Sequence, residues 1–257
     1  MSTTARNTVV AYLLIAIMAL VFPTILLSPQ PDSFTVYVNL YTTVTALIAV
    51  LHCFRILETL HQSSSSLIRP WIFITAGLAL WTSAELTFST HLVLLGEAPL
   101  LSLADFLWLI GYPFLFHGIS GIASPISRLL RQAGLKNGKR VKLFVHILVI
   151  AFIFMILAVR SPIILEKGVL EIIMTLYVVL DLALLTLALS TVTVFYPGYY
   201  AFPLTLICAS FAMFAVSDFL YMMAGAYEST LADLIYAFTY VTLNIGLYLY
   251  WKKGFYP

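Results

Sequence analysis

The sequence contains very little charge. Of its 257 residues only 9% are Asp, Glu, Lys or Arg, whereas 62% are hydrophobic, and the mean hydropathy is +1.02. A soluble domain carries about 25% charged residues, so this chain cannot cover a surface that faces water. The formal net charge of +2 is also too small to indicate nucleic-acid binding. The composition therefore predicts an integral membrane protein whose partner is the lipid bilayer, with no nucleic acid.

Cysteine is nearly absent, and the common cofactor motifs are missing. The two cysteines, Cys53 and Cys208, lie inside apolar runs, which is typical of small buried residues and does not imply a disulfide. No lysine falls within an apolar run, which argues against a retinal Schiff base, and the five histidines form no matched pair that would hold haem. The sequence thus identifies neither a metal nor a cofactor. Without a phosphate-binding glycine loop or a nucleophile elbow, we expect no enzyme activity.

Long apolar runs dominate the chain instead. A helix that crosses a bilayer needs about 20 mostly apolar residues. Eight segments meet this requirement: 8–28, 34–56, 71–95, 102–124, 143–161, 169–193, 200–225 and 230–250. The first run is longer than the apolar core of a signal peptide, about 7–15 residues, and no small-residue cleavage pattern follows it. The predicted fold is an all-α polytopic bundle of eight transmembrane helices, multi-pass in the cell membrane.

The basic residues predict the orientation of these spans. With the N-terminus inside, only Arg160 and Lys167 of the 13 lysines and arginines would lie outside the cell. This asymmetry fits the positive-inside rule, so both termini are expected to be cytoplasmic. The basic loop 125–142 either orients the chain and contacts anionic headgroups or docks a cytoplasmic or membrane protein partner.

Two similar phrases indicate an internal duplication. "LSLADFLWLIGY" begins at position 101 and "STLADLIYAFTY" at 229, which is 128 residues later. One helix upstream, segment 76–88 aligns with 209–221 at a separation of 133, and segment 39–47 aligns with 175–183 at 136. Either Leu- and Ala-rich helices match by chance, or the chain holds two copies of one unit. We expect two parallel four-helix repeats, 1–124 and 143–257, with ligand sites near their interface.

Acidic residues inside apolar spans are the strongest functional signal. An ionised carboxylate at the centre of a membrane helix costs about 2.5–3.5 kcal/mol on insertion scales, so such groups are expected to face the interior of the bundle. Except for one near mid-helix, these acids fall in the outer halves of their spans, as does a histidine, which predicts an acidic cavity that opens outward. The predicted ligand- or cation-binding residues are Glu85, Asp105, Asp181, Asp218, Asp233, Trp81, His91, Trp108, Tyr112, Tyr221, Tyr236 and Tyr240.

The two LAD phrases also permit a structural interpretation. "SLAD" and "TLAD" fit the capping-box pattern, in which Ser102 or Thr230 caps a helix and the aspartate bonds back to it. The aromatic residues three and seven positions after each aspartate share its helix face, and they serve either as packing and interfacial anchors or as cavity lining. Glu85, Asp181 and Asp218 have no capping explanation. They either form interhelical hydrogen bonds or contact a ligand, a proton or a cation.

The phrase "SLADFLWLIGYP" (102–113) matches the pattern S-x-A-D-x-x-[WY]-x-x-G-Y-P, and Glu85 supplies an acid in the preceding helix. In this it resembles poorly characterised multi-span N-terminal membrane regions of some bacterial diguanylate cyclases and histidine kinases. The resemblance covers mainly 71–124, with a weaker echo in 200–250. It implies signal sensing coupled to a cytoplasmic output domain. Since the sequence ends at "WKKGFYP", we expect that the output either comes from a separate polypeptide or does not exist.

Two functions therefore fit the sequence. The first is an integral membrane sensing or ligand-binding module, or the membrane subunit of a larger complex, with an acidic outward-facing cavity. The second is a small proton- or cation-coupled transporter or channel. The inner halves of the spans lack acids that would continue a transport pathway, which favours the first.

Overall fold

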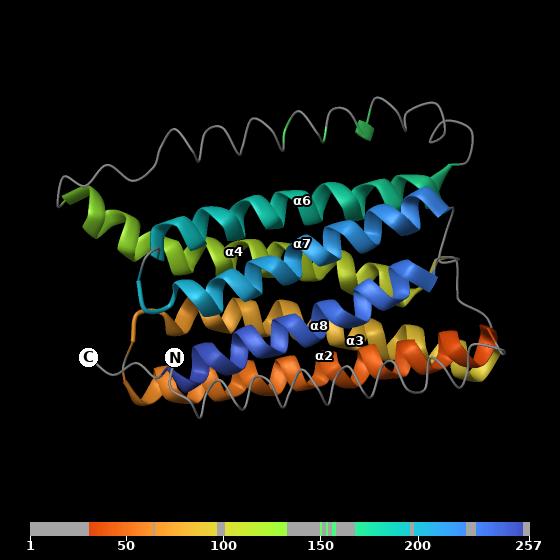
Figure 1. The fold of residues 1–257 in the computed structure, drawn as a ribbon, viewed down its shortest axis with the longest axis horizontal. Helices are drawn as coiled ribbons and strands as arrows, with labels where there is room; N and C mark the ends of the chain where they lie inside the picture. Colours follow the sequence, from red (N-terminus) through yellow and green to blue (C-terminus); the bar gives the residue numbers. More distant parts are fainter. Residues whose placement is uncertain are drawn as a thin grey trace.

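The computed structural model describes residues 31–63, 65–96, 101–132, 168–195, 198–224 and 230–253, together with positions 150, 153, 156 and 157. These residues form helices joined by turns, with no strand among them (Figure 1). The long helices are α2 (Pro31–Gln62), α3 (Ile68–Leu95), α4 (Leu103–Gln132), α6 (Val169–Phe195), α7 (Ala201–Ala224) and α8 (Thr230–Lys252). The predicted span 8–28, most of 143–161 and residues 133–142 of the basic loop lie outside the described residues. Residues 125–132, predicted as part of that loop, instead continue helix α4.

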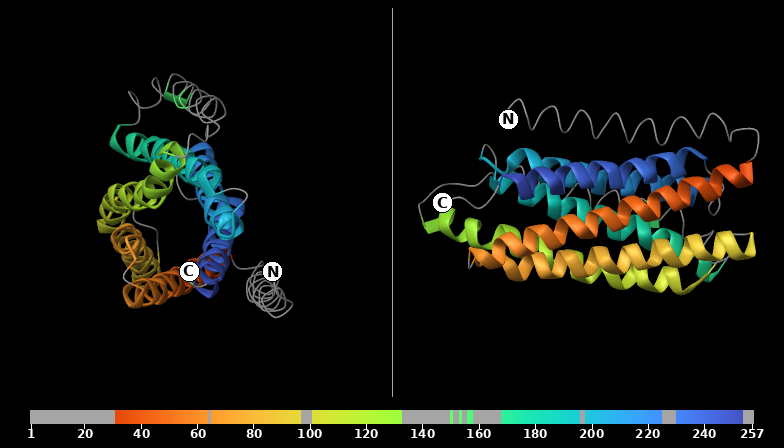
Figure 2. Two further views of the ribbon diagram at one scale, coloured as in Figure 1. Left: turned by 90° about the vertical axis from the view of Figure 1, so that its left-hand side faces the viewer. Right: turned by 90° about the horizontal axis from the view of Figure 1, so that it is seen from below.

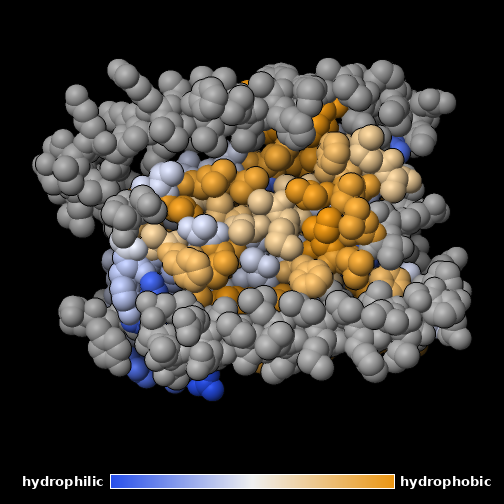
Figure 3. Space-filling view, viewed as in Figure 1, coloured by the Kyte–Doolittle hydropathy of each residue, from blue (hydrophilic) through white to orange (hydrophobic). Residues whose placement is uncertain are grey.

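Within the described residues, six helices are long and apolar enough to cross a membrane. Their outer faces carry exposed large side chains such as Val44, Leu94 and Met223. Figure 3 shows hydrophobic side chains over most of the visible central face of the bundle. Such a surface is stable against lipid and unfavourable in water. The chain is therefore a multi-pass membrane protein.

The six helices form a closed ring. Going round it, the order of contacting neighbours is α2, α3, α4, α6, α7, α8 and back to α2. The end-on view in Figure 2 shows this arrangement, and α8 packs beside α2 although the two are far apart in the sequence. A ring leaves every described helix with one face toward its interior. The interior is thus the place where polar side chains escape lipid.

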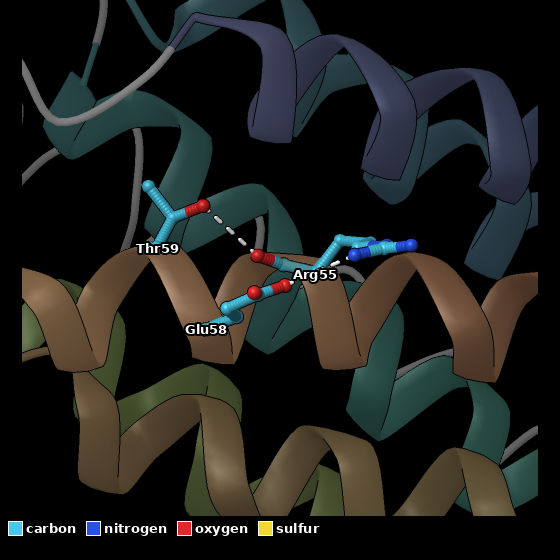
Figure 4. A network of polar contacts seen from close by, with 3 residues as sticks. All are labelled: Arg55, Glu58 and Thr59. Carbon is cyan, nitrogen blue, oxygen red and sulfur yellow. Dashed lines mark hydrogen bonds and ion pairs between the residues drawn. The ribbon is translucent and has the colours of Figure 1, made fainter.

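Ion pairing contributes little to this fold. The one salt bridge in the described part of the chain joins Arg55 and Glu58 at 3.1 Å, with side chains 63% and 57% exposed (Figure 4). Thr59 donates a hydrogen bond to the Arg55 carbonyl on the same helix. Exposed pairs of this kind contribute about 0–1 kcal/mol. Packing within the ring, rather than surface charge, must hold the helices together.

Two glycines allow close helix contacts of the same kind. At Gly118 of α4 an added Cβ would lie 2.5 Å from Ile74 Cγ1 and 2.8 Å from the Pro70 carbonyl oxygen of α3. At Gly246 of α8 it would lie 2.8 Å from Ile207 Cγ1 and 3.1 Å from the Pro203 carbonyl oxygen of α7. Small residues at such crossings let membrane helices approach closely. The pairs α3–α4 and α7–α8 therefore pack through the same three residue types.

Alanine at either glycine should destabilise the protein. Overpacking a tight contact costs about 1–3 kcal/mol, and 1 kcal/mol corresponds to about 2–4 °C in a chain of this size. We expect Gly118→Ala and Gly246→Ala each to lower the Tm of detergent-solubilised protein by about 2–10 °C. Ser120→Ala, at an exposed position of α4, is the matched control and should leave the Tm unchanged. Equal Tm values for all three variants would contradict the packing described above.

Candidate functional site

A cavity lies inside one half of the ring. This half is built from the N-terminal parts of α2, α4, α6 and α8 and the C-terminal parts of α3 and α7. The space open to the centre of a water-sized sphere is about 80 Å³, and one water needs about 10–15 Å³ by this measure, so several waters or a small organic molecule fit. The lining residues are Thr35, Asn39, Trp81, Glu85, Phe88, Trp108, Tyr112, Met174, Tyr177, Asp181, Phe214, Asp218, Tyr221, Asp233 and Tyr236.

Four acids predicted from the sequence converge on this cavity. Glu85 comes from α3, Asp181 from α6, Asp218 from α7 and Asp233 from α8. Glu85 is 2% exposed and Asp181 is 1% exposed. A carboxyl group buried this deeply needs hydrogen-bond partners or a counter-charge. The partners of each acid therefore indicate what it does.

Glu85 is held by three donors through a single oxygen. Its Oε1 accepts hydrogen bonds from Trp108 Nε1 at 3.2 Å, from the Tyr236 hydroxyl at 2.7 Å and from the Tyr240 hydroxyl at 3.1 Å. Trp108 belongs to α4 and both tyrosines belong to α8, so this carboxyl connects α3 to two other helices. The geometry matches the interhelical hydrogen bonding that the sequence left open for this residue.

Asp181 and Asp218 form a carboxyl pair. The Tyr112 hydroxyl donates to Asp181 Oδ1 at 2.6 Å. No donor among the described residues reaches Asp181 Oδ2, which is buried. Asp218 is a second acid that lies close to Asp181 and lines the same cavity. This pair is therefore the part of the site whose hydrogen-bonding capacity the protein leaves incomplete.

The two LAD aspartates differ from each other. Asp105 caps α4, because the Ser102 backbone N–H donates to its Oδ2 at 2.9 Å and the Ala104 N–H donates to Ser102 Oγ at 3.1 Å. The Tyr177 hydroxyl of α6 donates to Asp105 Oδ1 at 2.9 Å, so this aspartate also connects two helices. It does not line the cavity. Asp233 does, and accepts a hydrogen bond from the Tyr221 hydroxyl.

Aromatic rings form a floor beneath the acids. Trp81 and Phe214 meet with their ring centroids 5.1 Å apart. Trp81 also contacts Tyr112 at 5.1 Å, and Phe214 contacts Tyr240 at 5.2 Å, both edge to face. Edge-to-face pairs at such distances are favourable beyond simple area burial. The floor is therefore a packed layer that separates the acidic half of the ring from the other half.

Below the floor lies a second cavity with a largely apolar lining. A smaller space of about 30 Å³ lies there, and its lining includes Trp71, Leu78, Phe211, Leu243 and Leu247. None of the residues that line it is charged, and Thr191 is its one hydroxyl. Within the described helices, the acids therefore end at the aromatic floor and do not continue through the ring.

Other predicted site residues lie near the cavity without lining it. Tyr240 contributes through Glu85, and His91 is half-buried with an Nδ1 that has no partner in the described part of the chain. Sequence reasoning missed Tyr177 and Phe214 as lining residues. For Phe214 the available signal was its alignment with Trp81 across the proposed repeats. No group of three or more His, Cys, Asp or Glu in the described residues is arranged to hold a metal ion.

Comparison of the chain with models of protein families, with curated proteins and with solved structures finds no match in any of the three. The fold and the site define its class: a multi-pass α-helical membrane protein whose helix ring encloses a cavity lined by acids and aromatics.

Removing the Glu85 carboxyl should destabilise the ring strongly. Glu85→Ala leaves three donors inside the ring without an acceptor, and an unsatisfied buried group costs about 1–3 kcal/mol. Tyr236→Phe and Tyr240→Phe each remove one donor and should cost about 1 kcal/mol. We expect the Tm to fall several degrees further in Glu85→Ala than in either phenylalanine variant. The exposed Glu58→Ala serves as control, and an equally stable Glu85→Ala would show that the network does not hold the helices.

Proposed function

We propose that the protein is a ligand-binding, signal-sensing module of the cell membrane. One observation carries the proposal: acids from four helices meet in a single cavity, and the buried Oδ2 of one of them, Asp181, has no donor among the described residues. Inserting a carboxyl into the membrane costs free energy. A bundle with only a structural role is therefore not expected to place four carboxyls in one cavity. A cavity with a few convergent polar groups and apolar walls is the usual form of a small-molecule site.

The closed floor favours binding over passage. The cavity ends at Trp81 and Phe214, and the space beyond them is small and apolar. A transported ion would lose its carboxyl contacts there and cross a low-dielectric layer. In this proposal the protein therefore signals that a ligand occupies the cavity and does not transport that ligand. In this proposal the cavity binds its ligand without changing it chemically, so the proposed role is not enzymatic.

Signalling from this cavity needs an output. The resemblance of 102–113 to membrane regions of diguanylate cyclases and histidine kinases supports a sensory role. In this proposal the chain acts as the membrane subunit of a larger complex, and the basic loop 125–142 contacts the cytoplasmic or membrane partner. Ligand binding between helices of the two proposed repeats would alter how these repeats pack against each other.

We also propose that the ring belongs to a duplicated design of eight helices, in which the repeats 1–124 and 143–257 each contribute three of the six described helices. The ring order supports it, since α2, α3 and α4 are followed by α6, α7 and α8 in the same sense. The packing contacts of Gly118 recur at Gly246, and Pro70 and Ile74 lie 133 residues before Pro203 and Ile207. That separation is the one by which the α3 and α7 sequences align. The contact between Trp81 and Phe214 then lies where the two repeats meet.

The carboxyl pair also favours a second candidate function. Two adjacent acids beneath an entrance can pass a proton, as in the proton relays of transporters. A proton- or cation-coupled transporter would need a path past the floor, for example through a rearrangement of Trp81 and Phe214.

Binding and flux distinguish the two functions. Purified protein is screened by thermal shift against small water-soluble amines, alcohols and carboxylates. We expect at least one class to raise the Tm of the wild type and to have no effect on the double variant Asp181→Asn/Asp218→Asn. Proteoliposomes loaded with a pH-sensitive dye should show no protein-dependent proton flux under a potassium–valinomycin potential. Flux that the double variant abolishes would establish the transporter, and a screen without any stabilising compound would defeat the sensing module.

The proposed orientation has its own test. Green fluorescent protein fused after Pro257 should fluoresce in a bacterial host, and alkaline phosphatase fused there should be inactive, because both report a cytoplasmic C-terminus. A phosphatase fusion after Glu166, in the predicted outer loop, should be active. The reverse pattern would show that the acidic cavity lies toward the cytoplasm.

A further inference from the structure

We infer that the cavity binds a small organic ammonium ion that carries at least one N–H donor, with its nitrogen between Asp181 and Asp218 and its apolar body against the aromatic lining. This inference rests on the proposed binding function and names the class of its ligand. It is argued from the partners of each acid, from the charge of the lining and from the nature of the walls.

The acids divide into two kinds. Glu85 and Asp233 receive tyrosine or tryptophan donors that belong to the protein. Asp181 is 1% exposed and lines the cavity, yet no donor among the described residues reaches its Oδ2. Asp218, a second acid close to Asp181, lines the same cavity. The missing group at this point is thus a hydrogen-bond donor, and two adjacent carboxyls favour one that carries positive charge.

The charge of the lining selects a cation. Four of the lining residues are acidic, and none is Lys, Arg or His. An anionic ligand would meet only repulsion, and a neutral ligand would leave the acids without a counter-charge. A cation with N–H groups supplies both the charge and the donors that Asp181 and Asp218 lack.

The walls select an organic cation over a metal ion. A hard metal ion prefers six or more oxygen ligands, and the described residues contain no group of three acids, cysteines or histidines suited to one. The remaining lining is largely aromatic, including Trp108, Tyr177 and Phe214. Trp108 and Tyr177 stand edge to face, with ring centroids 6.3 Å apart. Aromatic faces attract organic ammonium ions through their quadrupole and also pack against an apolar body.

The carboxyl pair further distinguishes between ammonium ions. A quaternary ammonium carries charge but no N–H, so it would leave Asp181 Oδ2 without a hydrogen bond, at a cost of about 1–3 kcal/mol. A primary ammonium has three N–H groups and can donate to both aspartates at once. The site should therefore prefer a primary amine to its trimethylated analogue.

Three compounds of one shape test the inference. Phenethylamine, its N,N,N-trimethylammonium analogue and 2-phenylethanol share a body and differ in charge and N–H donors. Each is titrated at pH 7 into the full chain in lipid nanodiscs, and binding is followed by calorimetry and by the fluorescence of the lining tryptophans. We expect saturable binding of phenethylamine, at least tenfold weaker binding of the trimethylammonium compound and no binding of the alcohol.

Variants locate the nitrogen. Asp181→Asn and Asp218→Asn should each weaken phenethylamine binding at least tenfold, whereas Glu58→Gln, an exposed carboxyl outside the cavity, should leave it unchanged. Elution volume and Tm show whether each variant is folded, and the two aspartate variants test the same claim independently. Persistent binding in both would overturn the placement of the nitrogen.

The compounds also separate this inference from the proposed function. If 2-phenylethanol binds as tightly as the amine, the cavity binds ligands but the requirement for a cation is wrong. If the trimethylammonium compound binds as well as the amine, the requirement for an N–H donor is wrong. If no amine binds while an alcohol or a carboxylate stabilises the protein in the thermal screen, the sensing module stands and the ammonium class is rejected. If nothing binds in either experiment, both proposals fail.

Discussion

The bonding of one buried oxygen organises this structure. Glu85 Oε1 accepts from Trp108, Tyr236 and Tyr240, and thereby joins α3 to α4 and α8 inside the ring. In the hydrocarbon core of a bilayer no water is available to replace these donors, so a carboxyl that faced lipid would be left without partners. Among the described helices, the interior of the ring is where such partners are placed. The aromatic donors, the floor beneath them and the cavity above all follow from keeping carboxyls out of lipid.

The need for hydrogen-bond donors to buried carboxyls also explains why tyrosine and tryptophan are frequent in the interior. Each offers a large apolar ring for packing and one polar group at its edge. Tyr112 shows both uses, since its ring contacts Trp81 while its hydroxyl donates to Asp181. Phe214, which is part of the floor, has no hydroxyl and donates no hydrogen bond to a carboxyl. The distribution of hydroxyls among these rings thus follows the distribution of acids.

Much of this arrangement could be predicted from the sequence. The apolar runs predicted six helices that the structure describes, and the five intramembrane acids marked the polar interior. The LAD phrase predicted the cap that Ser102 and Asp105 form. The identity of the donors was not readable, because Glu85 meets Tyr236 only when α8 closes the ring beside α2. Tyr177 escaped notice for the same reason: nothing local links it to Asp105, which lies 72 residues away.

Closure of the ring by its last helix has a consequence for biogenesis. Translation delivers α3 to the membrane long before α8, and the donors at Tyr236 and Tyr240 follow Glu85 by 151 and 155 residues. Until they arrive, Trp108 is the one member of the trio already synthesised. Until then the Glu85 carboxyl has only one of its three donors. It must therefore stay in the insertion machinery or at the bilayer surface. Assembly of this protein ends, rather than begins, with the contact that its mature form depends on most.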